Sequence, residues 1–257
     1  MPPTDFQHAK RYGQNFLTSP GMQCKIIAEF AAHYDGHRPL VEIGPGVGDL
    51  TQFILKHNPL LLEIDPRAVK VLREKFPGLT VRTTDALADL EQRAAYLPAN
   101  FYLFANLPYN VGSRMLVALG QHYSRTPFTV ILQQEVAYKA RLDETNLTLF
   151  GAWLNFVWDL RVPFKITKGN FTPAPRVDSA MLQGTPKNRL DVDLPRAFAI
   201  LKALFVHPKK TLANNLKNLD WTPEQIQAFH VTHQLPLTTR LNADNYADLL
   251  LKILATK

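Results

Sequence analysis

Glu42-Ile43-Gly44-Pro45-Gly46-Val47-Gly48 closes a short apolar run that begins near residue 39 and predicts a buried strand. Glycines placed directly after a strand let the backbone turn sharply and approach a ligand where a Cβ would collide. A glycine-rich loop is weak evidence by itself, because nucleotide-binding folds of many kinds have one. The sequence on either side must therefore decide what the loop binds.

Strands and helices alternate along the chain around this loop. Apolar runs predict further strands at 60–64, 79–82, 101–105 and 128–132, and amphipathic patterns predict helices at 22–33, 51–56 and 68–72. This alternation indicates an α/β fold with a mostly parallel sheet that helices cover on both faces. Ligands of such sheets bind beyond the carboxyl ends of the strands. The glycine loop lies at one of those ends.

The character of the chain changes after about residue 184. Residues 184–188 read as a turn-rich linker, and helices are expected at 194–206, 210–219, 223–230 and 244–254. We therefore expect a Rossmann-like catalytic domain at 1–185 and a small all-helical domain at 186–257.

Two acidic residues follow the next predicted strands. Glu63 lies at the end of the second strand, where its carboxylate could accept two hydrogen bonds from a ribose diol. Asp85 follows the third strand and could accept from an adenine amino group. The alternative is that both carboxylates only cap helices.

Two cofactors compete for this loop. A nicotinamide dinucleotide site has the pattern G-x-G-x-x-G, whose third glycine packs the helix on the strand. Here the pattern is Gly44-x-Gly46-x-Gly48, with an acid two residues before the first glycine. This form favours S-adenosylmethionine, which has no pyrophosphate for the loop to hold.

The fourth strand ends in Asn106-Leu107-Pro108-Tyr109-Asn110. An exocyclic adenine amine is a poor nucleophile, and acceptors that bind its N–H groups favour the tetrahedral nitrogen needed for attack. The Asn106 side-chain carbonyl and the Pro108 backbone carbonyl are the expected acceptors. Tyr109 offers a ring on which a flipped base can stack. An ordinary Asn-Pro turn is the alternative interpretation.

The sequence resembles the ribosomal RNA adenine N6,N6-dimethyltransferase family over nearly its whole length. The motifs that carry the resemblance are Gly13-Gln14-Asn15-Phe16-Leu17, Glu42-Ile43-Gly44-Pro45-Gly46, Asn106-Leu107-Pro108-Tyr109-Asn110, Gln134-Glu135-Val136 and Phe171-Thr172-Pro173-Ala174-Pro175-Arg176-Val177-Asp178-Ser179. The resemblance implies a cofactor site formed by Asn15, Leu17, Gly44, Gly46, Glu63, Asp85 and Asn106. It also implies that Phe171 stacks on the target adenine opposite Tyr109.

Within the family, the Phe171–Ser179 motif and the modest basicity resemble the small-subunit enzyme. That enzyme dimethylates two adjacent adenosines near the 3′ end of small-subunit RNA. The alternatives are a large-subunit methyltransferase of the macrolide-resistance type, a non-catalytic nucleic-acid-binding relative, and a methyltransferase for DNA or small molecules. The chain departs from the family pattern at 146–151 and at 207–215, where two arginines are replaced, so these departures bear on RNA docking rather than on chemistry.

The charge supports an RNA partner. The formal net charge is +7 and the pI is about 9.5, which favours an anionic ligand. Lys10, Arg11, Lys209 and Lys210 are the expected phosphate contacts. We expect a monomer that acts on a partly assembled ribosomal subunit.

Cysteine and hydropathy patterns limit the other function classes. The one cysteine, Cys24, precludes an internal disulfide, fits a reducing cytoplasm and is expected to be a buried thiol. The eight histidines lack metal-ligand spacing, so no metal site is expected. No apolar run is long enough to predict a membrane span.

Overall fold

The structure, a computed structural model, describes residues 15–142, 147–189 and 191–256. Internal contacts divide the chain into two units. The first contains Met1–Tyr138 and Trp158–Asn188, and the second contains Lys139–Val157 and Arg189–Lys257. The boundary between Asn188 and Arg189 lies close to the domain boundary expected near residue 185. Residues 139–157, which were expected to belong to the first domain, group with the second unit instead.

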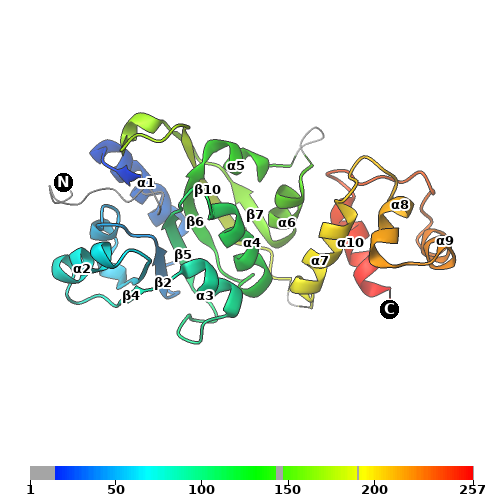
Figure 1. Ribbon diagram of the computed structural model, residues 1–257, viewed down its shortest axis with the longest axis horizontal. Helices are drawn as coiled ribbons and strands as arrows, with labels where there is room; N and C mark the ends of the chain where they lie inside the picture. The colour runs from blue at the N-terminus through cyan, green and yellow to red at the C-terminus, as the bar shows by residue number, and fades with distance from the viewer. Residues whose placement is uncertain (1–14, 143–146, 190, 257) are drawn as a thin grey trace. The chain divides into compact units, whose positions relative to one another are not determined.

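Within the described residues, the first unit is built on an eight-stranded sheet (Figure 1). In spatial order its strands are β4 (Val81–Thr83), β3 (Leu60–Glu63), β2 (Leu40–Ile43), β5 (Tyr102–Asn106), β6 (Phe128–Gln133), β10 (Ser179–Pro186) and β7 (Trp158–Arg161), and β8 (Lys165–Ile166) also pairs with β10. The first five are parallel, so the five strands expected from the apolar runs are confirmed. Strand β10 is antiparallel to its three partners.

Strand β10 corrects the expected linker at 184–188. The strand continues to Pro186, and Gly184 lies directly opposite Phe128 in register. A Cβ at Gly184 would collide with the Phe128 ring, so this glycine makes room for a side chain instead of making a turn.

Helices connect the strands of the first unit. They are α1 (Pro20–His33), α2 (Pro66–Lys75), α3 (Ala86–Gln92), α4 (Gly112–His122) and α5 (Gln134–Lys139). The Asp65 and Asp85 side chains cap the amino ends of α2 and α3, and α3 packs against α4. The helix expected at 51–56 is two short 3-10 turns, Thr51–Phe53 and Leu55–His57. A separate two-stranded pair joins β1 (Phe16–Leu17) to β9 (Phe171–Thr172), which follows a 3-10 turn at Lys168–Asn170.

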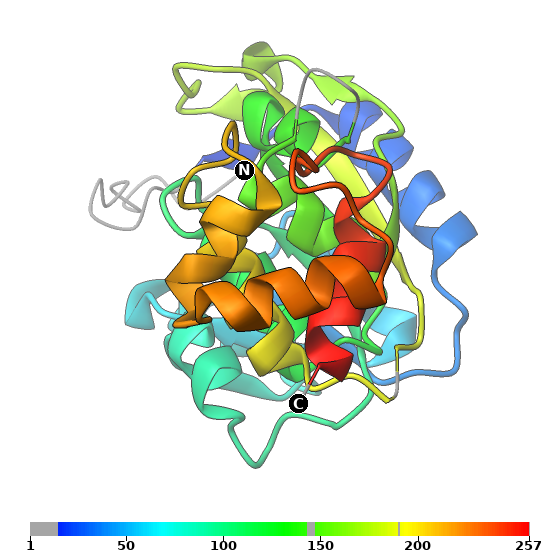
Figure 2. The ribbon, with the colours of Figure 1, turned by 90° about the vertical axis from the view of Figure 1, so that its right-hand side faces the viewer.

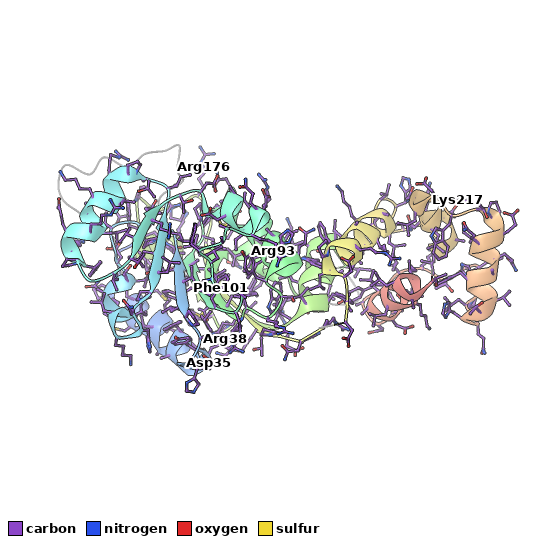
Figure 3. The ribbon with its side chains drawn as sticks, turned by 90° about the horizontal axis from the view of Figure 1, so that it is seen from below. Asp35, Arg38, Arg93, Phe101, Arg176 and Lys217 are labelled. Carbon is purple, nitrogen blue, oxygen red and sulfur yellow. The ribbon has the colours of Figure 1, made fainter. Side chains whose placement is uncertain are left out.

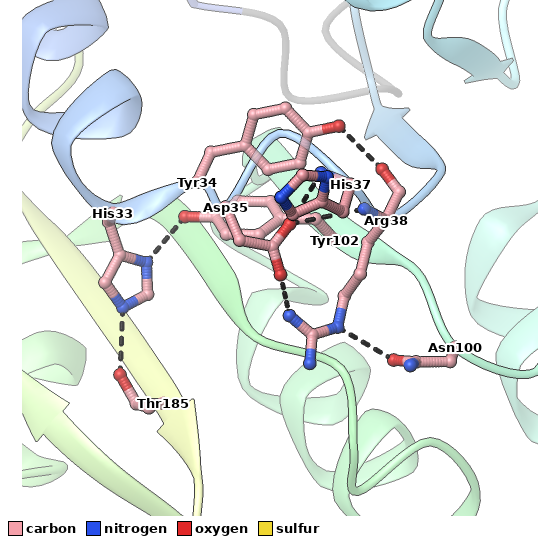
Figure 4. Close-up of polar contacts among 8 residues, drawn as sticks. All are labelled: His33, Tyr34, Asp35, His37, Arg38, Asn100, Tyr102 and Thr185. Atoms are coloured by element: carbon pink, nitrogen blue, oxygen red, sulfur yellow. Dashed lines mark hydrogen bonds and ion pairs between the residues drawn. The ribbon is translucent and has the colours of Figure 1, made fainter.

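A polar network lies toward the ends of the sheet where β2 and β5 begin (Figure 4). His33 Nδ1 lies 2.6 Å from the Tyr102 hydroxyl, and His33 Nε2 lies 3.0 Å from the Thr185 hydroxyl. The Tyr102 hydroxyl also lies 2.6 Å from Thr129 Oγ1 inside the core. The network therefore ties α1 to β5, β6 and β10 while giving these polar groups partners.

Figure 3 separates the two edges of this sheet. Asp35 and Arg38 precede β2 at one edge, where Arg38 Nε donates to Asn100 Oδ1 at 3.0 Å. Arg176 lies at the opposite edge, in the segment that leads into β10.

The second unit is helical. It contains α6 (Leu149–Val157), α7 (Leu194–Leu204), α8 (Leu212–Leu216), α9 (Pro223–Thr232) and α10 (Tyr246–Ala255), with a 3-10 turn at Lys217–Leu219. Helices α6, α7 and α10 pack together, and Trp153 meets Phe198 edge-on with ring centroids 5.0 Å apart. In Figure 2, α9 (orange) lies nearly horizontal and α10 (red) stands nearly upright. Among the residues described, no helix is long and apolar enough to cross a membrane.

Candidate active site

A cavity of about 300 Å³ lies at the carboxyl ends of the parallel strands in the first unit. Its lining includes these residues expected from the sequence: Asn15, Leu17, Gly44, Gly46, Glu63, Asp85, Asn106, Pro108 and Tyr109. They reach the same cavity because the parallel strands β2, β3 and β5 all end at this edge. Residues that are far apart along the chain therefore meet in one site.

The glycine loop has the backbone that the sequence predicts. Gly44 and Gly46 have φ values of +66° and +59°, a region that side chains with a Cβ rarely adopt. A Cβ on Gly46 would also lie 2.8 Å from Phe16 Cε1. The loop can therefore follow the cavity wall only with glycine at these positions.

Glu63 connects this loop to the next strand end. Its Oε2 accepts from the Gly46 N–H at 2.9 Å, and its Oε1 accepts from the Asp65 N–H at 2.9 Å. The side chain is buried, and burial raises its pKa, whereas backbone hydrogen bonds from Asp65, Gly46 and Ile64 oppose that rise. Each carboxylate oxygen has a second lone pair that can accept a ligand hydroxyl. Glu63 does not cap a helix, so the capping alternative fails for it.

Asp85 does cap a helix, and it also lines the cavity. Its Oδ1 accepts from the Leu87 N–H at 2.9 Å and from the Ala88 N–H at 3.4 Å. Both bonds use one oxygen, so Oδ2 can accept from a ligand amino group. The capping and binding interpretations are therefore compatible at this residue.

Asn106 ends β5 beside Ile131 of β6. Its Nδ2 donates to the Asn15 backbone carbonyl at 3.2 Å, which joins the N-terminal motif to the strand end. This contact orients the amide so that Oδ1 is its acceptor group for a ligand. The geometry thus suits the acceptor role expected for Asn106.

The Pro108 carbonyl differs from the expectation. It accepts from the N–H groups of Val111 at 3.2 Å and Gly112 at 3.0 Å, at the start of α4. Because a carbonyl oxygen has two lone pairs, both are already used inside this loop. The structure therefore does not leave this carbonyl free to bind a substrate amine.

The two expected stacking rings lie in different surroundings. Tyr109 is half-buried and lines the cavity. Phe171 is only 3% exposed, lies in the core cluster that contains Leu17, and does not line the cavity. The reason is that β9 pairs with β1, with Leu17 opposite Phe171, and this pairing turns the ring inward. The structure does not place Phe171 opposite Tyr109 in this site.

Glu42 is a site residue whose environment the sequence did not reveal. It lies inside β2, is 3% exposed and lines the cavity. Burial raises its pKa to about 8, and the Thr51 hydroxyl, which donates to Glu42 Oε2 at 2.8 Å, opposes this rise. The signal in the sequence was an acid within an otherwise apolar strand.

The expected RNA contacts fall outside this cavity. Lys209 and Lys210 are exposed and precede α8, and Lys217, labelled in Figure 3, is exposed as well. Lys10 and Arg11 lie outside the described residues.

The expectation that Cys24 is buried is wrong, because its side chain faces solvent on α1.

The charge of the cavity favours one of the two cofactors. Among the described residues, its lining contains no lysine or arginine and four acidic residues, Glu42, Asp49, Glu63 and Asp85, of which Glu42 keeps its proton at neutral pH because its pKa is raised to about 8. A dinucleotide brings an anionic pyrophosphate, which this lining would repel. S-adenosylmethionine brings a sulfonium, an ammonium and a ribose diol, which acidic acceptors suit. The hydrogen-bond acceptors that line the cavity therefore fit S-adenosylmethionine.

Comparisons with known proteins agree with this fit. A family model described as "Ribosomal RNA adenine dimethylase" matches residues 5–256. Ribosomal RNA small subunit methyltransferase A of Chlorobium luteolum is 35% identical over 224 residues, which span 84% of this chain and 80% of that protein.

Two solved structures share the fold. A dimethyladenosine transferase from Plasmodium falciparum superimposes with a TM-score of 0.73 at 21% identity, covering 93% of this chain and 95% of that one. The 23S rRNA methyltransferase ErmE superimposes with a TM-score of 0.66 at 22% identity, covering 94% of this chain and 99% of that one.

Proposed function

Because the chain belongs to the ribosomal RNA adenine dimethylase family, we propose that it transfers methyl groups from S-adenosylmethionine to N6 of two adjacent adenosines in small-subunit ribosomal RNA. The observation that carries this proposal is that one cavity joins the acidic cofactor acceptors Glu63 and Asp85 to Asn106 and Tyr109. A cofactor site and a base site must adjoin for a direct transfer.

The cofactor end depends on two acidic side chains and one glycine. Glu63 would accept from the ribose diol, Asp85 Oδ2 from the adenine amino group, and Gly46 gives the ligand room beside Phe16. S-adenosylmethionine supplies an electrophilic methyl group on its sulfonium. No nucleophilic side chain is needed, so orientation and electrostatics would supply most of the rate.

The base end depends on Asn106 and Tyr109. Asn106 Oδ1 would accept a hydrogen bond from the target amine, and this hydrogen bond would strengthen as the nitrogen becomes tetrahedral. The Tyr109 ring would stack on the extruded adenine, and such stacking contributes roughly 1–3 kcal/mol. With the Pro108 carbonyl occupied, a single protein acceptor holds the amine, and this leaves the second N–H position able to turn for a second methylation.

The substrate assignment rests on relatives. Ribosomal RNA small subunit methyltransferase A of Chlorobium luteolum carries the small subunit in its name, and it is 35% identical to this chain over 84% of this chain's length. We propose a partly assembled small subunit as substrate, Lys10, Arg11, Lys209 and Lys210 as phosphate contacts, and action as a monomer in the cytoplasm. A large-subunit substrate is the second candidate, because ErmE shares the fold.

One experiment tests these alternatives. The purified protein is incubated with methyl-labelled S-adenosylmethionine and with undermethylated small or large subunits, and the modified nucleotides are mapped. We expect N6,N6-dimethyladenosine at two neighbouring positions near the 3′ end of small-subunit RNA. Label on large-subunit RNA alone would support the second candidate, and no transfer to either subunit would indicate a non-catalytic relative.

A further inference from the structure

The Tyr109 hydroxyl has a buried partner that lies far away in the sequence. Tyr109 Oη is 2.6 Å from Ser179 Oγ, and 70 residues separate them. Ser179 begins β10 and is 0% exposed, whereas Tyr109 lies in the half-buried turn after β5. The hydrogen bond therefore runs from a loop at the cavity to a strand of the core sheet.

Ser179 is held from both sides of its strand. It lies in register with Gln133 of β6 and with Ile166 of β8. The neighbouring Asp178 adds further restraints, because its Oδ1 accepts from the Lys168 N–H at 2.8 Å and its Oδ2 lies 2.8 Å from Lys165 Nζ. Its backbone carbonyl also accepts from the Gln134 N–H at 2.9 Å. The Ser179 hydroxyl is thus a fixed point in the structure.

A tyrosine ring is oriented by its two ends. The backbone fixes the Cβ end, and a hydrogen bond at the hydroxyl fixes the opposite end, so the long axis of the ring is set. Hydrogen bonds of a phenol hydroxyl lie close to the plane of its ring, so the direction of the bond also favours one orientation of that plane. Without the second restraint, the ring can turn about its side-chain torsions. At Tyr109 such turning would change the face that lines the cavity.

We propose that Ser179 is a positioning residue for methyl transfer, which holds the Tyr109 ring at the position where the target adenine stacks on it. This inference rests on the proposed function, since it assigns Ser179 a role in orienting the base. Ser179 does not line the cavity, so it acts through Tyr109 and not on the substrate. The reaction depends on alignment, and a ring that turns freely lowers the fraction of bound adenine whose amine faces the methyl group.

The test is a double-mutant cycle with Ser179→Ala, Tyr109→Phe and the combined variant. Single-turnover methyl transfer to undermethylated small subunits is measured at saturating cofactor, and S-adenosylmethionine affinity is measured by calorimetry. We expect each single variant to slow transfer about tenfold, the size of one lost buried hydrogen bond. The cofactor dissociation constant should change less than about twofold, a split that general loss of structure would not give.

The combined variant separates positioning from independent effects. Each substitution already releases the ring, so the combined variant should be no slower than the slower single variant. Tyr34→Phe is the matched control: it removes a hydroxyl that donates to the Arg38 carbonyl at 2.6 Å, at the opposite edge of the sheet, and should leave the transfer rate unchanged. If Ser179→Ala fails to fold, Tyr109→Phe still removes the same hydrogen bond from the cavity side and keeps the ring.

The outcomes distinguish the two proposals. Rates for both single variants within twofold of the wild type would overturn the role of Ser179, and so would slowing factors that multiply in the combined variant. In both cases the active wild type leaves the proposed function standing. A wild-type protein that methylates neither subunit would refute the proposed function itself.

Discussion

The Glu63 carboxylate accepts a hydrogen bond from the Gly46 N–H at 2.9 Å, and so joins the end of β3 to the glycine loop after β2. One buried side chain therefore both shapes the loop and presents an anion to the cavity. Substitutions at Glu63 should affect ligand affinity through both of these roles.

Glu63→Ala should weaken S-adenosylmethionine binding at least about tenfold, because the ribose diol would lose a charged acceptor. Glu63→Gln keeps the shape and one acceptor oxygen but places an NH2 group against one of the two backbone N–H donors, so its affinity should lie between those of Glu63→Ala and the wild type. Calorimetry with S-adenosylmethionine and with NAD measures both affinities. Wild-type protein that binds NAD but not S-adenosylmethionine would refute the cofactor assignment.

Asn106→Ala should lower the single-turnover methyl-transfer rate by about 100-fold, the typical loss for one hydrogen bond that strengthens in the transition state. RNA affinity should change far less. Rates are compared at saturating cofactor, because Asn106 also donates to Asn15 beside the cofactor site. Asn100→Ala, at the opposite edge of the sheet, is the control. A wild-type rate for Asn106→Ala would mean that the motif is only a turn.

Glu42 should make the ligand-free protein less stable at high pH. Its pKa is raised to about 8, so the folded protein keeps a proton that the unfolded chain releases above about pH 4.5. The contribution to stability is complete below pH 4.5 and is lost as the pH rises through 8. Glu42→Gln does not titrate and should be more stable than the wild type at pH 9, by on the order of 5 kcal/mol.

Urea unfolding of Glu42→Gln and wild type at pH 5 and pH 9 measures this difference. The glutamine Oε1 can still accept from the Thr51 hydroxyl, so the core contact is retained. An advantage of equal size at both pH values would show that Glu42 does not titrate in this range.

The contribution of His33 to stability should depend on pH in the opposite direction. Burial and the charge of Arg161 lower its pKa below 6.5, and Glu29 opposes this shift. The folded protein therefore resists a proton that the unfolded chain accepts, so this contribution is present above pH 6.5 and is lost as the pH falls below it. Between pH 7.5 and 5.5 the wild type should lose more stability than His33→Gln does.

Lys209→Gln and Lys210→Gln should weaken RNA binding at all sequences alike. Each lost phosphate contact should reduce the slope of log K against log salt by roughly one unit. Titrations of small-subunit RNA at several salt concentrations measure the slope. Lys56→Gln has the same loss of charge at the edge of the sheet opposite the cavity and should keep the wild-type slope. Unchanged slopes for both lysine variants would place the RNA elsewhere.

Much of the site could be predicted from local sequence. The glycine loop, Glu63, Asp85 and Asn106 each follow an apolar run, and the carboxyl ends of parallel strands meet at one edge of a sheet. Because each of these polar residues follows an apolar run that forms a strand, the parallel arrangement of the strands brings the residues together. The positive φ values of Gly44 and Gly46 were likewise implied by glycine itself.

Contacts between distant segments were decided only by the tertiary structure. Gly184 reads locally as a turn, yet it faces Phe128 across a strand pair. The family resemblance implies that Phe171 is a stacking ring, yet pairing with β1 buries it, and the Pro108 carbonyl is used by the start of α4. The Tyr109–Ser179 hydrogen bond joins residues with no shared pattern. Sequence periodicity reports which face of an element is buried, but strand register and loop packing decide which atoms meet there.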